Sequence, residues 1–194
     1  MKNYSAYAQV KDILEKGNYD CLKRNSTFWQ QPSDELGYSY KIIETNYHIF
    51  MTVETSSGQV LLESTDREHG FVVGAEAIEE KLKGYEKIDA LRGEQFYLSS
   101  FHLFRQISRS QLPGLLYFNQ SVDAFHKKDL IASCSFLQKA WRVYENPRIE
   151  EFTPILIRTI LLSGLDELEK KQMVSVLREH QRHTFTSTIA SKVN

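Results

Sequence analysis

Several features that would place this chain in a familiar class are missing from its sequence. It has two cysteines, Cys21 and Cys134, which lie far apart in the chain, so we expect no structural disulfide. No apolar run approaches the roughly 20 residues of a membrane span. A net charge of −1 argues against nucleic acid or a membrane surface as a partner. What remains is a chain with the composition of a soluble globular protein.

Signals for bound cofactors are also lacking. No glycine-rich phosphate-binding loop is present. Glu179, His180 and His183 lie close together near the end of a predicted helix, but no second pair of ligands accompanies them. Cations are favoured at a helix C-terminus, which accounts for these histidines without a metal. The sequence therefore predicts neither a metal ion nor a cofactor.

The N-terminal segment does not have the form of a signal peptide. Residues 4–16 carry apolar side chains at helical spacing and end at Gly17, which predicts a helix. We therefore expect a cytoplasmic protein by default. A leader removed from a longer precursor would leave the same sequence, so this predicted location rests only on the residues present.

One cysteine opens a predicted helix. Residues 17–20 have the composition of a loop, and the helix that follows begins at Cys21 and ends before Pro32. The unpaired N–H groups and the positive dipole end of a first helical turn favour a thiolate over a thiol. Such a position can lower a cysteine pKa from about 8.5 to roughly 3.5–7.5. Cys21 is therefore a candidate nucleophile.

Three β-strands are predicted after this helix. They cover residues 38–44, 48–54 and 60–64, where β-branched and aromatic residues are frequent. Their alternation is imperfect, which is typical of strands covered on both faces. A four-residue turn between the second and third strands would pair Glu54 with Gln59.

The strand register decides which acid accompanies a histidine. With the turn at residues 55–58, His48 falls opposite Thr65, and Glu63 becomes its diagonal neighbour on the same face of the sheet. A slip of one residue would instead bring Asp66 opposite His48. From spacing alone, both acids stay open as partners of His48.

This order of residues resembles a known family. A helix-opening Cys21, the turn Leu36-Gly37-Tyr38, the strand start His48-Ile49-Phe50 and the strand end Leu62-Glu63-Ser64-Thr65-Asp66 resemble the transglutaminase-like branch of papain-type cysteine enzymes. The likeness covers about Gly17 to Gly70 and is to small bacterial members of that branch with tetratricopeptide-type helices after the core.

The resemblance implies roles for three residues. Cys21 falls on the family's nucleophile, His48 on its base and Glu63 on the acid that orients the base. The family has Asp-Pro-Thr or Glu-Thr-Thr at the last position, and Glu63-Ser64-Thr65 fills it here, which favours Glu63 over Asp66. The implied protein is a cysteine hydrolase or acyltransferase that acts on a peptide or protein.

The second half of the chain is predicted to be helical. Pro113 stands in the opening turn of one helix, a second follows over residues 132–144, and Pro147 lies beyond it. This pattern resembles one tetratricopeptide unit. Two more helices are predicted over residues 149–163 and 165–180. Cys134, inside the second helix, is expected to be small core filler.

The predicted protein is of the α+β class. Residues 1–90 form the transglutaminase-like core, 91–109 a bridging segment, 110–183 the tetratricopeptide-like helices and 184–194 a flexible tail. The rival hypothesis is a catalytically inactive scaffold of the same fold, whose helical half binds a protein, a peptide or a second copy. An exposed apolar face on those helices would favour this rival.

Overall fold

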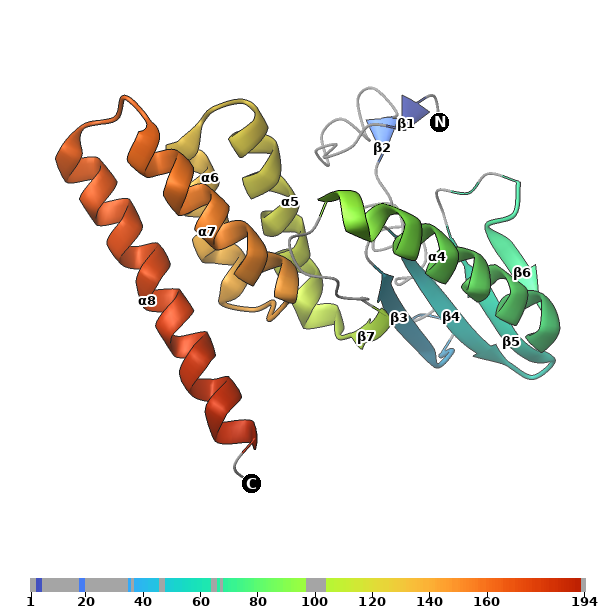
Figure 1. Ribbon diagram of the computed structural model, residues 1–194. Helices are drawn as coiled ribbons and strands as arrows, with labels where there is room; N and C mark the ends of the chain where they lie inside the picture. The colour runs from blue at the N-terminus through green and yellow to red at the C-terminus, as the bar shows by residue number, and fades with distance from the viewer. Residues whose placement is uncertain are drawn as a thin grey trace. The chain divides into compact units, whose positions relative to one another are not determined.

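The computed structural model describes residues 3–4, 18–19, 35, 37–45, 48–63, 66, 68–96 and 104–192. The fold is α+β, as expected from the sequence (Figure 1). The chain divides into two compact units, Met1–Leu112 and Pro113–Asn194, and each is described by itself. The helices predicted over residues 4–16 and 21–31 lie outside the described residues, apart from Tyr4.

The first unit contains a five-stranded antiparallel sheet. Its strands, in the order in which they neighbour one another, are β6 (Phe71–Val73), β5 (Gly58–Leu62), β4 (Ile49–Thr55), β3 (Tyr40–Thr45) and β7 (Phe104–Ile107). Two further strands of two residues each, β1 (Asn3–Tyr4) and β2 (Asn18–Tyr19), pair in parallel with each other.

The central hairpin has the register that the sequence predicts. Glu54 pairs with Gln59, and the ladder between β4 and β5 runs on to Met51 opposite Leu62. The Gln59 side chain also donates a hydrogen bond of 2.7 Å to the Glu54 carboxylate across the strands. Residues 49–53 of β4 are all buried, so both faces of the sheet are covered at this strand.

The helix α4 (Ala75–Phe96) covers one face of the sheet (Figure 1). Its inward side chains Ile78 and Tyr85 form a buried cluster with Phe50 and Leu61. These two helix positions are seven residues apart, which places them on the same face of an α-helix. The cluster fixes α4 against the strands that carry the candidate site.

The described part of the segment 91–109 belongs to the first unit's regular structure. Residues 91–96 complete α4, and Phe104–Ile107 form β7, the edge strand beside β3. The antiparallel pairing joins Ile42 to Ile107 and Thr45 to Phe104. The sheet therefore takes an edge strand from a segment far along the chain.

The second unit consists of helices. A short 3-10 turn, η1 (Arg109–Gln111), precedes them, and the helices are α5 (Leu112–His126), α6 (Leu130–Trp141), α7 (Pro147–Leu162) and α8 (Glu167–Lys192). The segment 184–194, expected to be a flexible tail, is helical as far as Lys192. None of the described helices combines the length and apolar character needed to cross a membrane.

Capping residues explain where two of these helices begin. The Asp129 carboxylate accepts a hydrogen bond of 3.0 Å from the Ala132 N–H at the start of α6. The Asn146 side chain accepts one of 2.9 Å from the Arg148 N–H at the start of α7. Each side chain satisfies a backbone donor that the helix itself leaves unpaired.

Candidate functional site

His48 stands at the connection between β3 and β4. Its backbone N–H donates a hydrogen bond of 3.0 Å to the Thr45 hydroxyl, and its carbonyl accepts one of 2.9 Å from the Thr45 N–H. Thr45 is fully buried. These bonds hold the backbone of His48 at the end of the hairpin, while its side chain stays 27% exposed.

Glu63 follows β5 and is buried beside this histidine. The Glu63 Oε1 atom lies 3.2 Å from His48 Nδ1, and only 3% of the Glu63 side chain is exposed. Its backbone N–H donates a hydrogen bond of 2.7 Å to the Gly70 carbonyl. The structure therefore brings together two of the three residues predicted for the triad.

The sheet register accounts for this contact. The last pair of the ladder is Met51 with Leu62, so continuing the register puts Phe50 opposite Glu63. His48, two residues before Phe50, is then the diagonal neighbour of Glu63 on the same face. This is the arrangement expected from a turn at residues 55–58.

Tyr85 of α4 completes the surroundings of the Glu63 carboxylate. Its hydroxyl donates a hydrogen bond to Glu63 Oε2. Its ring centre lies 5.0 Å from that of His48 and 5.2 Å from that of Phe50. Burial, and then the neighbouring Glu63 carboxylate, raise the pKa of Tyr85 far above its ordinary value. The hydroxyl therefore keeps its proton and acts as a donor.

Lys81, one helical turn before Tyr85, connects the two acids. Its Nζ atom lies 3.7 Å from Glu63 Oε2 and donates a hydrogen bond to Asp66 Oδ2. The Lys81 side chain is 17% exposed. A cation that is largely removed from water favours the charged form of both carboxylates.

Asp66, the alternative acid, is engaged elsewhere. Besides Lys81, the backbone N–H groups of Glu68 and His69 donate to its Oδ1 atom at 3.2 Å and 2.9 Å. Burial by itself raises the pKa of Asp66, but the hydrogen bonds from Lys81 and these N–H groups outweigh it, and the pKa falls below its ordinary value. Of the two candidate acids, Glu63 is the one placed against the imidazole.

The turn that follows Asp66 requires a glycine at position 70. A Cβ atom at Gly70 would lie 2.0 Å from the Glu63 carbonyl oxygen and 2.2 Å from the Asp66 carbonyl oxygen. Only a residue without a side chain allows the backbone to approach so closely. Gly70 thereby holds the end of β5 and the following loop in the conformation that places Glu63.

Cys21, the predicted nucleophile, lies outside the described residues, as do Ser64 and Thr65. The other cysteine, Cys134, is a free buried thiol. Burial raises the pKa of Cys134 to about 11, although a hydrogen bond from Gln138 opposes this shift. A thiol with so high a pKa is a poor nucleophile at neutral pH.

The arrangement around His48 suits proton transfer. With Nδ1 facing a buried carboxylate, the ring is biased towards the tautomer that carries its proton on Nδ1. The lone pair of Nε2 is then available to accept a proton from a nucleophile or a water molecule. Among the described residues, no group of three or more metal-ligating side chains is placed to hold a metal ion.

Two residues of this site were not anticipated from the sequence. Tyr85 and Lys81 belong to α4, a segment in which the sequence predicted no site residue. Positions 78, 81, 82 and 85 form one stripe of an α-helix. A polar side chain within an otherwise apolar stripe is the signal that could have identified Lys81 and Tyr85.

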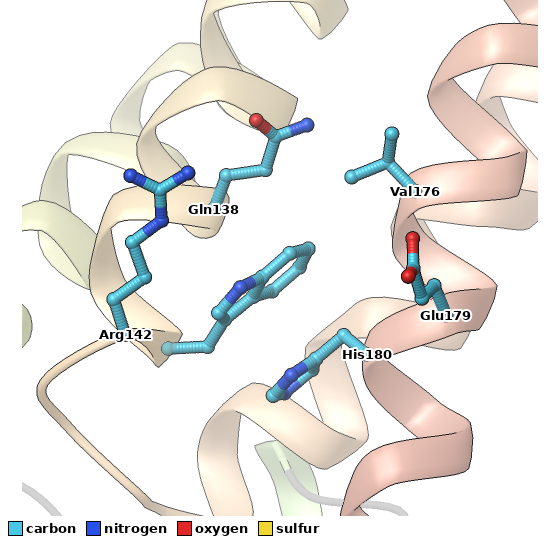
Figure 2. Close-up of a pocket in the computed structure, with 6 residues that line it drawn as sticks. Gln138, Arg142, Val176, Glu179 and His180 are labelled. Atoms are coloured by element: carbon cyan, nitrogen blue, oxygen red, sulfur yellow. The ribbon is translucent and has the colours of Figure 1, made fainter.

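A hollow lies between α6 and α8 in the second unit, the helical unit (Figure 2). Its volume is about 360 Å³, and Gln138 and Arg142 face Glu179 and His180 across it. The Trp141 and His180 rings stack with centres 4.2 Å apart and planes 6° apart. The stacking assigns His180 a packing role within this hollow.

No family model matches the chain, and neither does any curated protein or solved structure.

Proposed function

We propose that this protein is a cysteine-dependent enzyme of the transglutaminase-like kind, which hydrolyses an amide bond or transfers its acyl group to an amine. Cys21 is the nucleophile, His48 the base and Glu63 the acid that orients the base. The observation that carries the proposal is the 3.2 Å contact between His48 Nδ1 and the buried Glu63 carboxylate.

The chemistry would proceed through an acyl-enzyme. His48 Nε2 removes the Cys21 thiol proton, and the sulfur attacks the carbonyl carbon to give a tetrahedral intermediate. Its collapse breaks the carbon–nitrogen bond, and the leaving amine takes the proton from His48. Water or a second amine then attacks the thioester, with His48 again accepting a proton, and the thiol is regenerated.

Electrostatics support the role given to Glu63. Burying a carboxylate costs several kcal/mol unless nearby groups compensate for its lost hydration. Here Tyr85 donates to it and the Lys81 ammonium lies 3.7 Å away. A carboxylate held in this way stabilises the imidazolium that forms when His48 accepts a proton.

The reactivity of the two thiols tests the proposal. We expect iodoacetamide at about pH 6 to alkylate Cys21 at least about tenfold faster than a free thiol, because a paired cysteine is partly thiolate at that pH. Cys134 serves as the internal control, since its raised pKa of about 11 keeps it protonated. Mass spectrometry of peptides distinguishes the two sites.

Variants connect this reactivity to His48 and Glu63. His48→Ala and Glu63→Gln should slow the alkylation of Cys21, and Cys21→Ala should abolish turnover of peptide amides and acyl esters. Cys134→Ser should change neither. Alkylation of Cys21 no faster than a free thiol, with Cys21→Ala as active as the wild type, would overturn the proposal.

A second candidate function rests on an exposed apolar face of the helical unit. Leu161 and Leu162 at the end of α7 are 49% and 78% exposed, and Leu168 at the start of α8 is 63% exposed. Leu161 and Leu162 line a groove of about 450 Å³ together with Arg158 and Arg178. The helical unit would then be a tetratricopeptide-like binding module for a segment that combines apolar and acidic residues.

Binding assays separate this candidate from the first. We expect an apolar, acidic peptide to bind the wild type and to lose about tenfold in affinity against a Leu161→Ser, Leu162→Ser double variant, because their burial supplies the affinity. Sedimentation equilibrium measures whether the protein forms a dimer, and so tests whether a second copy of the chain occupies the groove. A wild type that stays monomeric and binds no peptide of this composition argues against a docking surface.

A further inference from the structure

We propose that Tyr85 is a positioning residue of the candidate site. Its hydroxyl donates a hydrogen bond to Glu63 Oε2 and thereby orients Oε1 towards His48, which sets the tautomer of the imidazole. This inference deepens the proposed function and rests on it for its catalytic meaning, while the geometry it describes belongs to Tyr85, Glu63 and His48 alone.

The two oxygens of the Glu63 carboxylate have different neighbours. Oε1 lies 3.2 Å from His48 Nδ1, whereas Oε2 accepts from the Tyr85 hydroxyl and lies 3.7 Å from Lys81 Nζ. A carboxylate can rotate about its last bond, which turns the oxygen nearest His48 away from the imidazole. The Tyr85 hydroxyl opposes that rotation, because turning the carboxylate stretches the hydrogen bond to its other oxygen.

Tyr85 also contacts the imidazole directly. The two ring centres are 5.0 Å apart with planes tilted by 34°, and the centre of the tyrosine ring also lies 5.2 Å from that of Phe50. Tyr85 is 5% exposed and belongs to the cluster that fixes α4 on the sheet. One rigid side chain therefore contacts both members of the His48–Glu63 pair.

The remaining charges near the pair keep Tyr85 in its role. Lys81 Nζ lies 5.5 Å from the centre of the Tyr85 ring and pairs with Asp66. Because burial and Glu63 raise the pKa of Tyr85, its hydroxyl donates at every pH at which the protein would act. Without this donor, the orientation of the Glu63 carboxylate towards His48 is held less firmly.

The tautomer of His48 is a direct measure of this role. Nitrogen-15 NMR of histidine-labelled protein distinguishes a proton on Nδ1 from one on Nε2. In the neutral imidazole of the wild type, we expect the Nδ1-protonated tautomer to predominate. Tyr85→Phe keeps the ring but removes the donor, so the ratio of the two tautomers should shift by at least about threefold towards Nε2 protonation, as expected when the partner that fixes a tautomer is loosened.

A matched control exists in the helical unit. Tyr144 is fully buried, and its hydroxyl accepts a hydrogen bond from the Asn146 amide. Tyr144→Phe removes a buried, hydrogen-bonded hydroxyl of the same kind but should leave the His48 signals unchanged. A shift in both variants would show a general effect of destabilisation and would overturn the assignment.

Kinetics provide a second readout. If the proposed function holds, Tyr85→Phe should lower kcat by about 10- to 100-fold, the range for partners that orient a functional histidine from behind. KM should stay unchanged, because Tyr85 is not proposed to touch the substrate. The NMR measurement needs no turnover and also works on Cys21→Ala protein. If the wild type is inactive but Tyr85→Phe shifts the tautomer ratio, only the proposed function is refuted. If the wild type is active but Tyr85→Phe leaves the tautomer ratio unchanged, only this inference is refuted.

A conservative replacement keeps the test valid if Tyr85→Phe does not fold. 3-Fluorotyrosine at position 85 retains the hydroxyl and makes it a stronger donor, so it should move the His48 nitrogen signals without loss of structure. The same replacement at Tyr144 should not move them. His48 signals that are insensitive to fluorination at Tyr85 would overturn the proposal.

Discussion

The two units bury polar groups in different ways. In the first unit, the sheet unit, the buried polar residues include two carboxylates, Glu44 and Glu63, at 1% and 4% exposure. In the helical unit, Ser121, Ser133 and Thr153 are fully buried and their hydroxyl groups are neutral, while the charged Arg148 is 9% exposed. Burying a charge costs far more than burying a hydroxyl. Burying the carboxylates of the sheet unit therefore costs more free energy of desolvation than burying these hydroxyls of the helical unit.

The hydroxyls of the helical unit are satisfied locally. Ser121 donates a hydrogen bond of 2.6 Å to the Ser133 carbonyl, and Ser133 donates one of 2.9 Å to the Ser121 carbonyl. Thr153 donates to the Ile149 carbonyl, four residues before it in α7, at 2.6 Å. These bonds tie helix to helix or a side chain to its own helix, and they involve no charged group.

The carboxylates of the sheet unit depend on distant partners. Glu44 lies 3.2 Å from Arg105 Nε on β7, and Glu63 is surrounded by His48, Lys81 and Tyr85. A buried ion pair contributes little net stability compared with apolar packing. Stability alone therefore gives no reason for the charges around Glu63, whereas the proton transfer proposed for His48 does.

The largest effect should come from removing the buried charge. Glu63→Ala leaves the Tyr85 hydroxyl without its acceptor and takes the partner from His48, so we expect the free energy of unfolding to fall by about 3 kcal/mol. Chemical denaturation followed by circular dichroism measures the loss.

The serine pair offers the contrasting variant. Ser121→Ala with Ser133→Ala removes both hydroxyls of a neutral pair, and both positions gain helix propensity, so the expected loss is about 1 kcal/mol or less. Equal losses for the Glu63 variant and the serine variant would break the distinction between the two units.

An intermediate effect is expected from Gly70→Ala. The added methyl group would meet the carbonyl oxygens of Glu63 and Asp66 at 2.0 and 2.2 Å, so the loop must shift, at a cost of about 1–3 kcal/mol. The same variant should disturb the His48 signals in NMR, because the loop places Glu63.

Gly84→Ala is the control for this variant. A Cβ atom at Gly84, within α4, would have no neighbour within 4 Å, and alanine favours a helix over glycine by about 0.5–1 kcal/mol. We therefore expect Gly84→Ala to stabilise the protein. Stabilisation by Gly70→Ala as well would contradict the close approach described for that loop.

The last effect depends on pH. Because the pKa of Asp66 is lowered in the folded protein, its carboxylate contributes stability above its ordinary pKa of 3.8, and this contribution is lost as the pH falls through the folded value. Asp66→Asn should therefore cost about 1 kcal/mol at pH 7 and progressively less below about pH 4. Denaturation curves of both proteins between pH 3 and 7 measure this difference, and one that is constant with pH would refute it.

Part of the fold follows from local sequence signals. The strands β3, β4 and β5 fall where β-forming residues predict them, and α7 begins at Pro147, two residues before the predicted helix start at Ile149. These features depend on neighbours in the chain, such as caps and turns. The hairpin of β4 and β5 also limits the acids that can reach His48 to Glu63 and Asp66, one for each of two registers.

Other features depend on contacts between distant segments. β7 is a four-residue edge strand whose pairing with β3 no local pattern encodes. The roles of Lys81 and Tyr85 depend on how α4 lies on the sheet, which hydrophobic spacing does not determine. The choice between the two acids for His48 also depends on α4. Its packing places Lys81 against Asp66, which the sequence pattern alone did not indicate.

The late position of β7 has a consequence for synthesis on the ribosome. β3 can find its neighbour β4 early, but its other edge is matched only by Phe104–Ile107, about sixty residues further on. Until that stretch leaves the exit tunnel, the nascent sheet presents an open edge, which invites pairing with another chain. A stop codon before Phe104 would therefore yield an aggregating fragment, whereas one just after the sheet unit would allow its strands to complete.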